Sequence, residues 1–222
     1  MLKANNITKT YNDRVVLNNV SLEIRSEIKA LIGLNGSGKS TLLKIIAGIV
    51  QPDKGNVLIG DRNVTDKPPE ERNLGYVPQH PALFQHLTVE DNIRYGLRNG
   101  RGSEESFQRI VELLDLKNEL KKKPRELSGG YKSRTSLARA LVSEPKVVLL
   151  DEPLSGIDAA LKDRILPDFR KALITAKVPV LFVTHDAQEA EIVADSFTLI
   201  KNGETQILNS SKEAFQLMRD AS

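Results

Sequence analysis

The sequence has no cysteine and no tryptophan among its 222 residues, and only 5% of its residues are aromatic. The absence of cysteine excludes disulfides, Cys-ligated zinc and Cys-ligated iron–sulfur clusters. A net charge of only +3 and few aromatic rings argue against a nucleic-acid-binding surface, which needs clustered basic residues with stacking rings. The one dense basic run, at residues 121–123, is typical of a solvated helix end or loop. We therefore expect no nucleic-acid partner.

The sequence also lacks long apolar runs. The longest, at residues 147–150 and 178–183, fall far below the ~20 residues that a membrane-spanning helix needs. The first five residues begin no apolar segment of the kind found in signal peptides. We expect no membrane span, so a partner must hold the chain if it works at a membrane. The length fits one large domain, or a core domain with one sizeable insertion.

Short apolar strands alternate with amphipathic helices along most of the chain. Apolar clustering predicts strands at residues 15–17, 20–24, 29–32, 56–59, 147–150, 178–183, 197–200 and 205–208. Helical periodicity predicts helices at residues 41–47, 131–142, 161–172, 187–194 and 211–218. Pro167 is expected to kink its helix, and Asn202 with Gly203 predicts a hairpin turn. This alternation predicts a mainly parallel sheet that helices cover on both faces.

The stretch from about residue 81 to residue 143 has a different character. Thr88 is expected to cap a helix, with Asp91 near the position that completes a capping box. Residues 104–114 are amphipathic at helical period. We expect a single domain over residues 1–222. In it, a helical subdomain at about 81–143 interrupts a core formed by residues 1–80 and 144–222.

Residues 33–40 match the pattern G-x-x-x-x-G-K-[ST] at every required position, between a predicted strand and a predicted helix. Glycines allow backbone N–H groups to curl around phosphates, and the positive end of the following helix points at the anion. Lys39 supplies a charge for the β- and γ-phosphates, and Ser40 offers a hydroxyl to Mg²⁺. The predicted ATP-binding residues of this segment are Gly33, Leu34, Asn35, Gly36, Ser37, Gly38, Lys39, Ser40 and Thr41.

A second constellation follows the apolar strand at residues 147–150. Two carboxylates, Asp151 and Glu152, stand at the carboxyl end of that strand, where open α/β sheets hold their sites. Asp151 is expected in the shell of the magnesium ion, and Glu152 is expected to orient or deprotonate the attacking water. Alone, this pattern also fits a strand that runs into a surface loop. The presence of the phosphate loop favours the functional interpretation.

These motifs and their order give the chain a resemblance to the nucleotide-binding subunits of ABC (ATP-binding cassette) transporters, over essentially its full length. Tyr11 matches the aromatic residue that stacks on adenine in that family, and Gln79 matches the loop glutamine that contacts magnesium and water. Residues 127–130 resemble the family signature, and residues 155–158 resemble its D-loop. His185 matches the histidine that contacts the γ-phosphate. A lone histidine is usually structural, so this assignment depends on the ordered set of motifs.

The resemblance implies an ATPase in which two chains enclose two ATP molecules head to tail, with Mg²⁺ as the second cofactor. The signature opens a helix and is therefore a second anion site, which in the family serves the partner's nucleotide. The implied site residues are Glu152, His185 and Gln79 for catalysis, Ser40, Gln79 and Asp151 for magnesium, and Tyr11, Ser128, Gly129, Gly130 and Asp158 for ATP besides the phosphate loop.

The expected fold class is α/β, with a phosphate-loop NTPase core and a mainly parallel sheet. An N-terminal antiparallel β subdomain and the inserted helical subdomain complete the expected fold. The partners implied by the resemblance are a second copy of the chain, integral membrane permease subunits and, indirectly, an extracytoplasmic substrate-binding protein. These partners imply a peripheral position at the cytoplasmic face of the cell membrane.

Two positions depart from the family pattern. Tyr131 follows the signature where glutamine is usual, and Gly156 stands in the D-loop where alanine is common. Because the serine and the glycines of the signature remain, we expect ATP hydrolysis to persist, at a low rate in the isolated subunit. The sugar contact and the tightness of the closed dimer are the properties that these departures affect.

Residues 68–79 and 82–93 resemble importer ATPases of the molybdate, tungstate, sulfate, iron, polyamine and sugar group. The loop that begins Pro68-Pro69-Glu70 favours an inorganic anion such as molybdate or tungstate as the cargo. The apolar cluster of Leu83, Phe84 and Leu87 is expected to receive a coupling helix of the membrane subunit, with ordinary helix packing as the alternative. We expect no C-terminal regulatory domain. The alternative functions are an ABC exporter subunit, a soluble non-transport ABC ATPase, and an ATP sensor without turnover.

Overall fold

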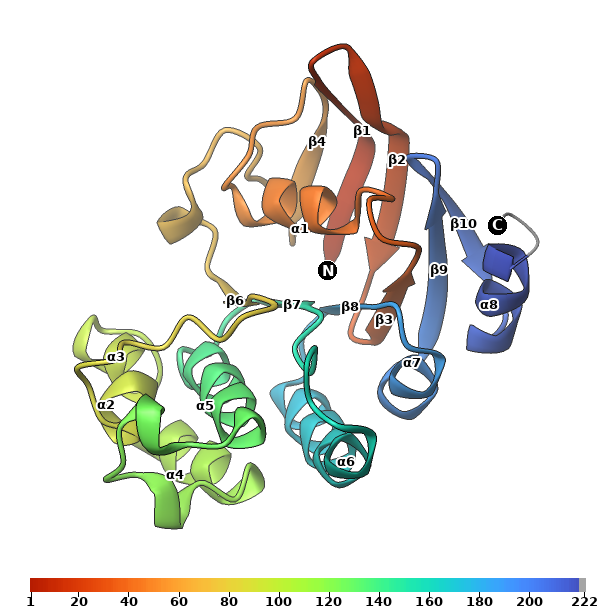
Figure 1. Cartoon of the computed structure of the whole chain (residues 1–222). Helices are drawn as coiled ribbons and strands as arrows, with labels where there is room; N and C mark the ends of the chain where they lie inside the picture. Colours follow the sequence, from red (N-terminus) through yellow and green to blue (C-terminus); the bar gives the residue numbers. More distant parts are fainter. Residues whose placement is uncertain (220–222) are drawn as a thin grey trace.

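The computed structural model describes residues 1–219 and arranges them as two β-sheets with helices packed against them (Figure 1). The larger sheet has the strand order β10-β9-β3-β8-β7-β6. Its strands are β3 (Ile28–Ile32), β6 (Leu74–Val77), β7 (Val147–Asp151), β8 (Val180–Thr184), β9 (Ser196–Lys201) and β10 (Glu204–Leu208). All neighbours in this sheet are parallel except β9 and β10.

The smaller sheet is antiparallel and has the order β2-β1-β4-β5. Its strands are β1 (Leu2–Tyr11), β2 (Arg14–Ile24), β4 (Lys54–Ile59) and β5 (Arg62–Asn63). Helix α1 (Lys39–Ala47) packs between this sheet and one face of the larger one, because its Leu42, Leu43 and Ile46 share a buried cluster with both. The two sheets therefore enclose the helix that follows the phosphate loop.

The other face of the larger sheet is covered by helices from the middle and the end of the chain. Strand β7 shows the division, since Val147 and Leu149 face α1 whereas Val148 and Leu150 join the cluster on the opposite face. The helices that contribute to this second cluster are α2 (Val89–Ile93), α4 (Glu104–Leu113), α5 (Gly129–Val142), α6 (Ala159–Ala176), α7 (Ala187–Val193) and α8 (Ser211–Arg219). Burial on both faces explains why the central strands are almost wholly apolar.

The segment after β6 contains only helices and turns before β7 begins. Besides α2, α4 and α5 it includes α3 (Tyr95–Arg98) and two short 3₁₀ turns, Lys117–Glu119 and Pro124–Glu126. A third 3₁₀ turn, Pro69–Glu71, precedes β6. Figure 1 shows α2 to α5 grouped to one side of the larger sheet. Thr88 caps α2 as predicted, because its Oγ accepts a hydrogen bond from the backbone N–H of Asp91 at 3.1 Å.

The fold class predicted from the sequence is confirmed: the protein is α/β, with an antiparallel sheet, a mostly parallel sheet and an inserted helical segment. The hairpin between β9 and β10 also forms, with φ of 52° at Asn202 and 76° at Gly203. The domain boundaries near residues 80 and 143 stay a prediction. Within residues 1–219, no helix combines the length and the apolar composition that crossing a bilayer requires.

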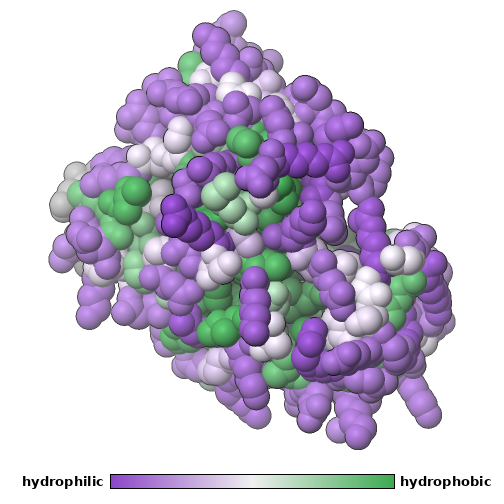
Figure 2. All heavy atoms as spheres, turned by 180° about the vertical axis from the view of Figure 1, so that it is seen from behind, coloured by the Kyte–Doolittle hydropathy of each residue, from purple (hydrophilic) through white to green (hydrophobic). Residues whose placement is uncertain are grey.

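Parts of the predicted secondary structure were wrong. Strands β1 and β6 were not predicted, and the two strands expected at 15–17 and 20–24 are one continuous strand, β2. Helix α6 begins two residues earlier than expected and continues through Pro167, where the expected kink stays a prediction. On the back face of the molecule, exposed apolar groups are interrupted by hydrophilic side chains (Figure 2).

Candidate active site

The phosphate loop lies between the end of β3 and the start of α1, as the sequence predicted. Two of its glycines have no room for a side chain. A Cβ on Gly33 would lie 2.5 Å from the carbonyl oxygen of Ile200, and a Cβ on Gly38 would lie 2.8 Å from Leu17. Gly38 also has φ = 101°, in the left-handed region that favours glycine. These contacts explain why the loop needs glycine at both positions.

The first turn of α1 is open to an anion. Gly38 is the N-cap and provides no side-chain acceptor, and no acidic residue lies in the first turn. The free N–H groups and the helix dipole therefore make a favourable place for a phosphate. Beside them, the hydroxyl oxygen of Ser37 is buried and has no hydrogen-bond partner among residues 1–219. An unpaired buried hydroxyl in a glycine cradle is what a polyphosphate ligand would satisfy.

A pocket of about 380 Å³ adjoins this loop. Its walls are the phosphate loop, the start of β2 and the β9–β10 hairpin, and the residues that line it are Arg14, Val15, Val16, Leu34, Asn35, Gly36, Ser37, Ile200, Lys201, Asn202, Gly203 and Met218. The pocket combines polar and apolar walls next to the anion site. Such a cavity can accept the less charged part of a nucleotide while the loop holds its phosphates.

Lys39 lies above the loop with its side chain 5% exposed. Its Nζ donates hydrogen bonds to the carbonyl oxygens of Gly33 at 2.8 Å and Leu34 at 2.9 Å, and lies 4.0 Å from Oε1 of Glu152. Burial lowers the pKa of Lys39, and the charges of Glu152 and Asp151 oppose that effect. The ammonium group is thus held at the mouth of the loop by acceptors that a phosphate can replace.

Ser40 and Asp151 form a pair of oxygen ligands. The hydroxyl of Ser40 donates to Oδ1 of Asp151 at 3.1 Å, and the phenol of Tyr76 lies 3.4 Å from Oδ2. Burial raises the pKa of Asp151, and the hydrogen bond from Ser40 works against that rise. A hydroxyl and a carboxylate next to a phosphate site suit Mg²⁺, which prefers a few protein oxygens together with phosphate oxygens. The donor set therefore fits the expected metal.

Glu152 brings the three predicted catalytic residues together. Its Oε2 accepts from Nε2 of Gln79 at 3.3 Å and lies 3.0 Å from Nδ1 of His185. Gln79 also donates to Oγ of Ser155 at 3.3 Å. Glu152 has φ = 46°, a left-handed conformation that costs a non-glycine residue about 1–2 kcal/mol. Strain of this kind concentrates at functional sites.

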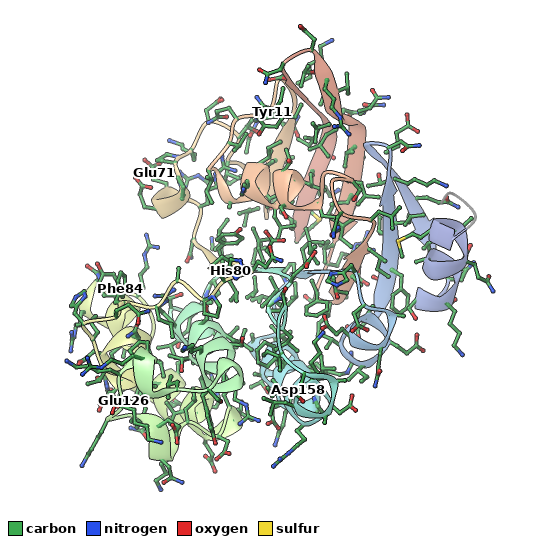
Figure 3. All side chains as sticks on the ribbon, in the orientation of Figure 1. Tyr11, Glu71, His80, Phe84, Glu126 and Asp158 are labelled. Carbon is green, nitrogen blue, oxygen red and sulfur yellow. The ribbon has the colours of Figure 1, made fainter. Side chains whose placement is uncertain are left out.

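Two predicted nucleotide-binding residues lie at the edges of this region. Tyr11 ends β1, is 42% exposed, and its ring has Nζ of Lys9 at 5.4 Å from the centroid. Thr41 is partly exposed in the first turn of α1. Figure 3 shows Tyr11 in the antiparallel sheet, at the opposite side of the molecule from Asp158. An exposed ring at that position is free to stack on a base.

The signature residues lie on a different part of the chain. Ser128 and Gly129 are exposed where α5 begins, and a Cβ on Gly130 would lie 2.7 Å from Cδ1 of Ile165 in α6. Asp158 caps α6, because its Oδ1 accepts from the N–H of Leu161 at 3.0 Å. Within residues 1–219, none of these four predicted residues shares a hydrogen bond or ion pair with Lys39 or Glu152. One chain therefore brings only part of the predicted set together.

Two side chains that contact the predicted site residues were not predicted from the sequence. Tyr76 and Ser155 were both part of quoted motifs, but neither was predicted to contact Asp151 or Gln79. The position of Tyr76, three residues before Gln79 on a strand beside β7, is the signal that could have placed it near the end of that strand.

Comparison with known proteins identifies the family. Residues 17–155 match the family model described as ABC transporter. Among curated relatives, a molybdate/tungstate import ATP-binding protein of Archaeoglobus fulgidus is 43% identical over 199 residues, which are 89% of this chain and 83% of the relative. The corresponding protein of Methanocaldococcus jannaschii is 41% identical over 208 residues, 92% of this chain and 69% of the relative.

Other relatives are named for different cargoes. An iron(III) import ATP-binding protein of Fusobacterium nucleatum is 38% identical over 97% of this chain, and the matched part is 59% of that relative. The chain thus spans less than two thirds of some of the curated relatives it matches.

Solved structures agree with the sequence matches. One, described as the ATP-binding subunit of an ABC transporter, has a TM-score of 0.84 at 28% identity and covers 99% of both chains. Another, a dimeric ATP-binding cassette in a post-hydrolysis state bound to ADP and phosphate, has a TM-score of 0.81 at 29% identity, covering 95% of this chain and 100% of that one. From the site, the family match and these likenesses, we conclude that the chain belongs to the ABC transporter family, as one of its ATP-binding ATPase domains.

Proposed function

We propose that this chain binds ATP with Mg²⁺, hydrolyses it and so energises the import of a small solute across a membrane. The observation that carries the proposal is the convergence of Lys39, Ser40, Asp151, Glu152 and His185 beside a glycine cradle with an open helix N-terminus. Phosphoryl transfer needs three elements: a positive charge near the phosphates, oxygen ligands for a metal ion, and a carboxylate that acts on the attacking water.

ATP binding follows from the chemistry of the loop. The phosphates replace the carbonyl oxygens of Gly33 and Leu34 as acceptors of the Lys39 ammonium, and the N–H groups at the start of α1 donate to them. Ser40 and Asp151 would hold a magnesium ion, which would supply positive charge to balance the charge that develops on the phosphate oxygens. Tyr11 stacks on the adenine.

Hydrolysis depends on the carboxylate of Glu152. A water between Glu152 and the γ-phosphate attacks the phosphorus and gives a proton to the carboxylate, while the bond from the phosphorus to the bridging oxygen breaks and ADP leaves with that oxygen. The imidazole of His185 and the amide of Gln79 orient the carboxylate and the phosphate. Lys39 stabilises the charge on the transferred group. Because Gln79 also contacts Ser155 in the D-loop, its amide links this site to the segment that leads into α6.

The complete site needs a second copy of the chain. Ser128, Gly129 and Gly130 open α5, whose N-terminus has no side-chain cap and no acidic residue in its first turn. That exposed end fits the γ-phosphate of an ATP held by the partner's phosphate loop. Two such contacts related by a two-fold axis give a closed, head-to-tail dimer, with Asp158 near the seam. The dimeric cassette among the solved relatives supports this arrangement.

The importer assignment rests on the curated relatives, and so does the cargo. Relatives of similar identity are named for molybdate/tungstate, iron(III), sulfate/thiosulfate and spermidine/putrescine. The highest identities quoted above belong to molybdate/tungstate proteins, and we propose an inorganic anion of that kind. Membrane permease subunits bind the expected surface at Phe84 and Leu87, which are partly exposed, whereas Leu83 of the same cluster is buried in the chain. The ring of Tyr95, 4.6 Å from that of Phe84, extends this surface, and the permease keeps the chain at the cytoplasmic surface. A substrate-binding protein outside the membrane delivers the anion to them.

ATP binding is tested with Lys39→Met, using exposed Lys54→Met as the matched control. We expect Lys39→Met to weaken ATP binding at least about 10-fold and to abolish phosphate release, with Lys54→Met unchanged. Equal affinity in the two variants would contradict the proposed site.

The cargo is tested in proteoliposomes with the permease and binding protein of the same organism. Molybdate or tungstate is expected to stimulate ATP hydrolysis, and stimulation by iron(III) or spermidine instead would overturn the anion assignment.

A further inference from the structure

The N-terminal turns of α6 and α7 are joined by two side-chain contacts. Nζ of Lys162 in α6 lies 2.6 Å from Oε1 of Glu189 in α7, and Nε2 of Gln188 donates to Oδ1 of Asp163 at 2.9 Å. Residue 185 lies immediately before the cap of α7, which is Asp186. The contacts between the two helices therefore lie directly beside His185.

Further polar contacts connect the Lys162–Glu189 pair to the residues on both sides of His185. Oε2 of Glu189 accepts from the hydroxyl of Thr184 at 2.6 Å, and that hydroxyl in turn accepts from the N–H of Asp186 at 3.0 Å. Nζ of Lys162 also lies 3.5 Å from Oδ2 of Asp186. Both neighbours of His185 in the sequence are thus connected to one ammonium group on α6.

The pair is shielded from water. Glu189 is 3% exposed, and the side chain of Lys162 is 17% exposed. Burial alone lowers the pKa of Lys162, but the hydrogen bond and charge of Glu189, with those of Asp186, outweigh it, and its pKa lies above the ordinary value. The ammonium therefore stays charged and holds a fixed direction. A buried ion pair adds little net stability compared with apolar packing, so its main consequence here is geometric.

Helix α6 connects the Lys162 contacts with the D-loop and the signature. It starts at the D-loop, where Asp158 is its cap, and Gly130 of the signature packs against its Ile165. In contrast, the ring of His185 itself is about half exposed, and within residues 1–219 Glu152 is the one side chain that pairs with it. The direction of the ring thus depends on the backbone at Thr184 and Asp186, which the Lys162 network holds.

We propose that Lys162 is a positioning residue for His185: it acts through Glu189, Thr184 and Asp186 to hold the imidazole against Glu152. The catalytic part of this proposal rests on the proposed function, because it takes His185 as a residue that acts in ATP hydrolysis. The positional part stands on the contacts alone.

The positional part is tested by nuclear magnetic resonance. The chain has three histidines, so the side-chain spectrum contains three imidazole signals, which single variants of His80, His86 and His185 assign. Lys162→Met is expected to shift the His185 signals and to leave those of His80 and His86 in place. Lys162→Arg is expected to preserve them, since a pocket of about 250 Å³ beside Lys162 has room for the guanidinium. Exposed Lys171→Met on the same helix is the control. Unshifted His185 signals in Lys162→Met would overturn the proposal.

The catalytic part is tested by a double-mutant cycle. Lys162→Met is expected to lower kcat about 10-fold at unchanged KM for ATP, because a displaced catalytic group loses its alignment. Combined with His185→Ala, it is expected to cause no further loss, since both changes remove the same interaction. A further loss of the full 10-fold in the double variant would assign Lys162 a general structural role and overturn the proposal.

If Lys162→Met does not fold, Glu189→Gln replaces it, because the amide keeps a bond to Thr184 while removing the charge that Lys162 needs. The same shifts and the same cycle are then expected. If His185→Ala alone leaves kcat unchanged, the role of His185 in the proposed function fails, whereas the imidazole signals still decide the positional part.

Discussion

Nδ1 of His185 and Oε2 of Glu152 lie 3.0 Å apart, although the two residues follow different strands, β8 and β7. These strands are parallel neighbours, so their carboxyl ends deliver both side chains to the same edge of the sheet. Gln79, which follows β6 on the other side of β7, reaches the same oxygen. Three adjacent strands therefore bring together one carboxylate and two side chains that contact it. This arrangement is the structural basis of the proposed hydrolysis.

Arg72 is expected to be essential for stability. It is 2% exposed and donates to the carbonyl oxygens of Lys67, Thr65, Ile45 and Ile46, the last two at the end of α1. Arg72→Met removes the donor that these carbonyl oxygens share, although Ile45 keeps a hydrogen bond from the N–H of Gly48, and should lower the free energy of unfolding by about 3 kcal/mol or more. Urea denaturation measures the change. The exposed control Arg109→Met should shift it by less than about 0.5 kcal/mol. A loss below about 1 kcal/mol in Arg72→Met would show that water satisfies the carbonyl groups.

Alanine substitutions at two neighbouring glycines allow the cost of backbone strain to be distinguished from that of steric overlap. Gly100 and Gly102 both have positive φ, 73° and 86°. A Cβ on Gly100 meets nothing within 4 Å, whereas a Cβ on Gly102 would lie 1.9 Å from the carbonyl oxygen of Val142. Gly100→Ala should therefore cost about 1 kcal/mol, from the left-handed backbone alone, and Gly102→Ala at least about 3 kcal/mol. Thermal unfolding of the two variants gives the comparison, and equal losses would refute the predicted overlap.

The ion pair between Arg94 and Glu104 is expected to give stability a dependence on pH. The Arg94 guanidinium, with the amide of Gln108, lowers the pKa of Glu104 from 4.5 to about 2. A carboxyl whose pKa is lower in the folded chain stabilises the fold above its unfolded pKa and loses that contribution as pH falls through the folded value. The difference in stability between the protein and Glu104→Gln should thus be constant above about pH 5 and shrink toward pH 2.

The difference should be small throughout, because Glu104 is on the surface, where water screens the pair. Denaturation at a series of pH values measures it. Glu105→Gln, which removes the neighbouring exposed carboxylate on the same helix, is the matched control. A carboxyl resonance of Glu104 that titrates near 4.5 would contradict the predicted pairing.

Much of the fold could be predicted because its signals are local. The phosphate loop, the Thr88 cap and the Asn202-Gly203 turn each depend on a few adjacent residues whose chemistry admits one conformation. Strand β1 has no such signal. Its polar residues interrupt the alternation, and its pairing shifts register at several points along β2. Strand β6 has only four residues, and its Gly75 fits a close contact with Ala140 that sequence does not reveal. In both strands tertiary contacts decide the structure.

The candidate site shows the same difference between residues that local patterns predict and contacts that the tertiary structure decides. Lys39, Asp151 and Glu152 could be predicted because each stands at a fixed place relative to a strand or helix end. The contacts of Tyr76 and Ser155 could not, since they depend on which side chains the sheet order brings together. The Lys162–Glu189 pair joins residues 27 positions apart across two helices, and no spacing rule connects them. Sequence patterns therefore predict the reacting groups better than the groups that position them.

The central claim is that Glu152 acts on the water in ATP hydrolysis. The most direct test measures phosphate release and ATP-dependent dimer formation for Glu152→Gln, with the exposed Glu112→Gln as the control. The amide keeps the size of the side chain but cannot accept the proton, so phosphate release should fall about 100-fold or more. ATP should still bind, and the dimer should accumulate because hydrolysis no longer opens it. Phosphate release by Glu152→Gln at the rate of the unaltered protein would contradict the account.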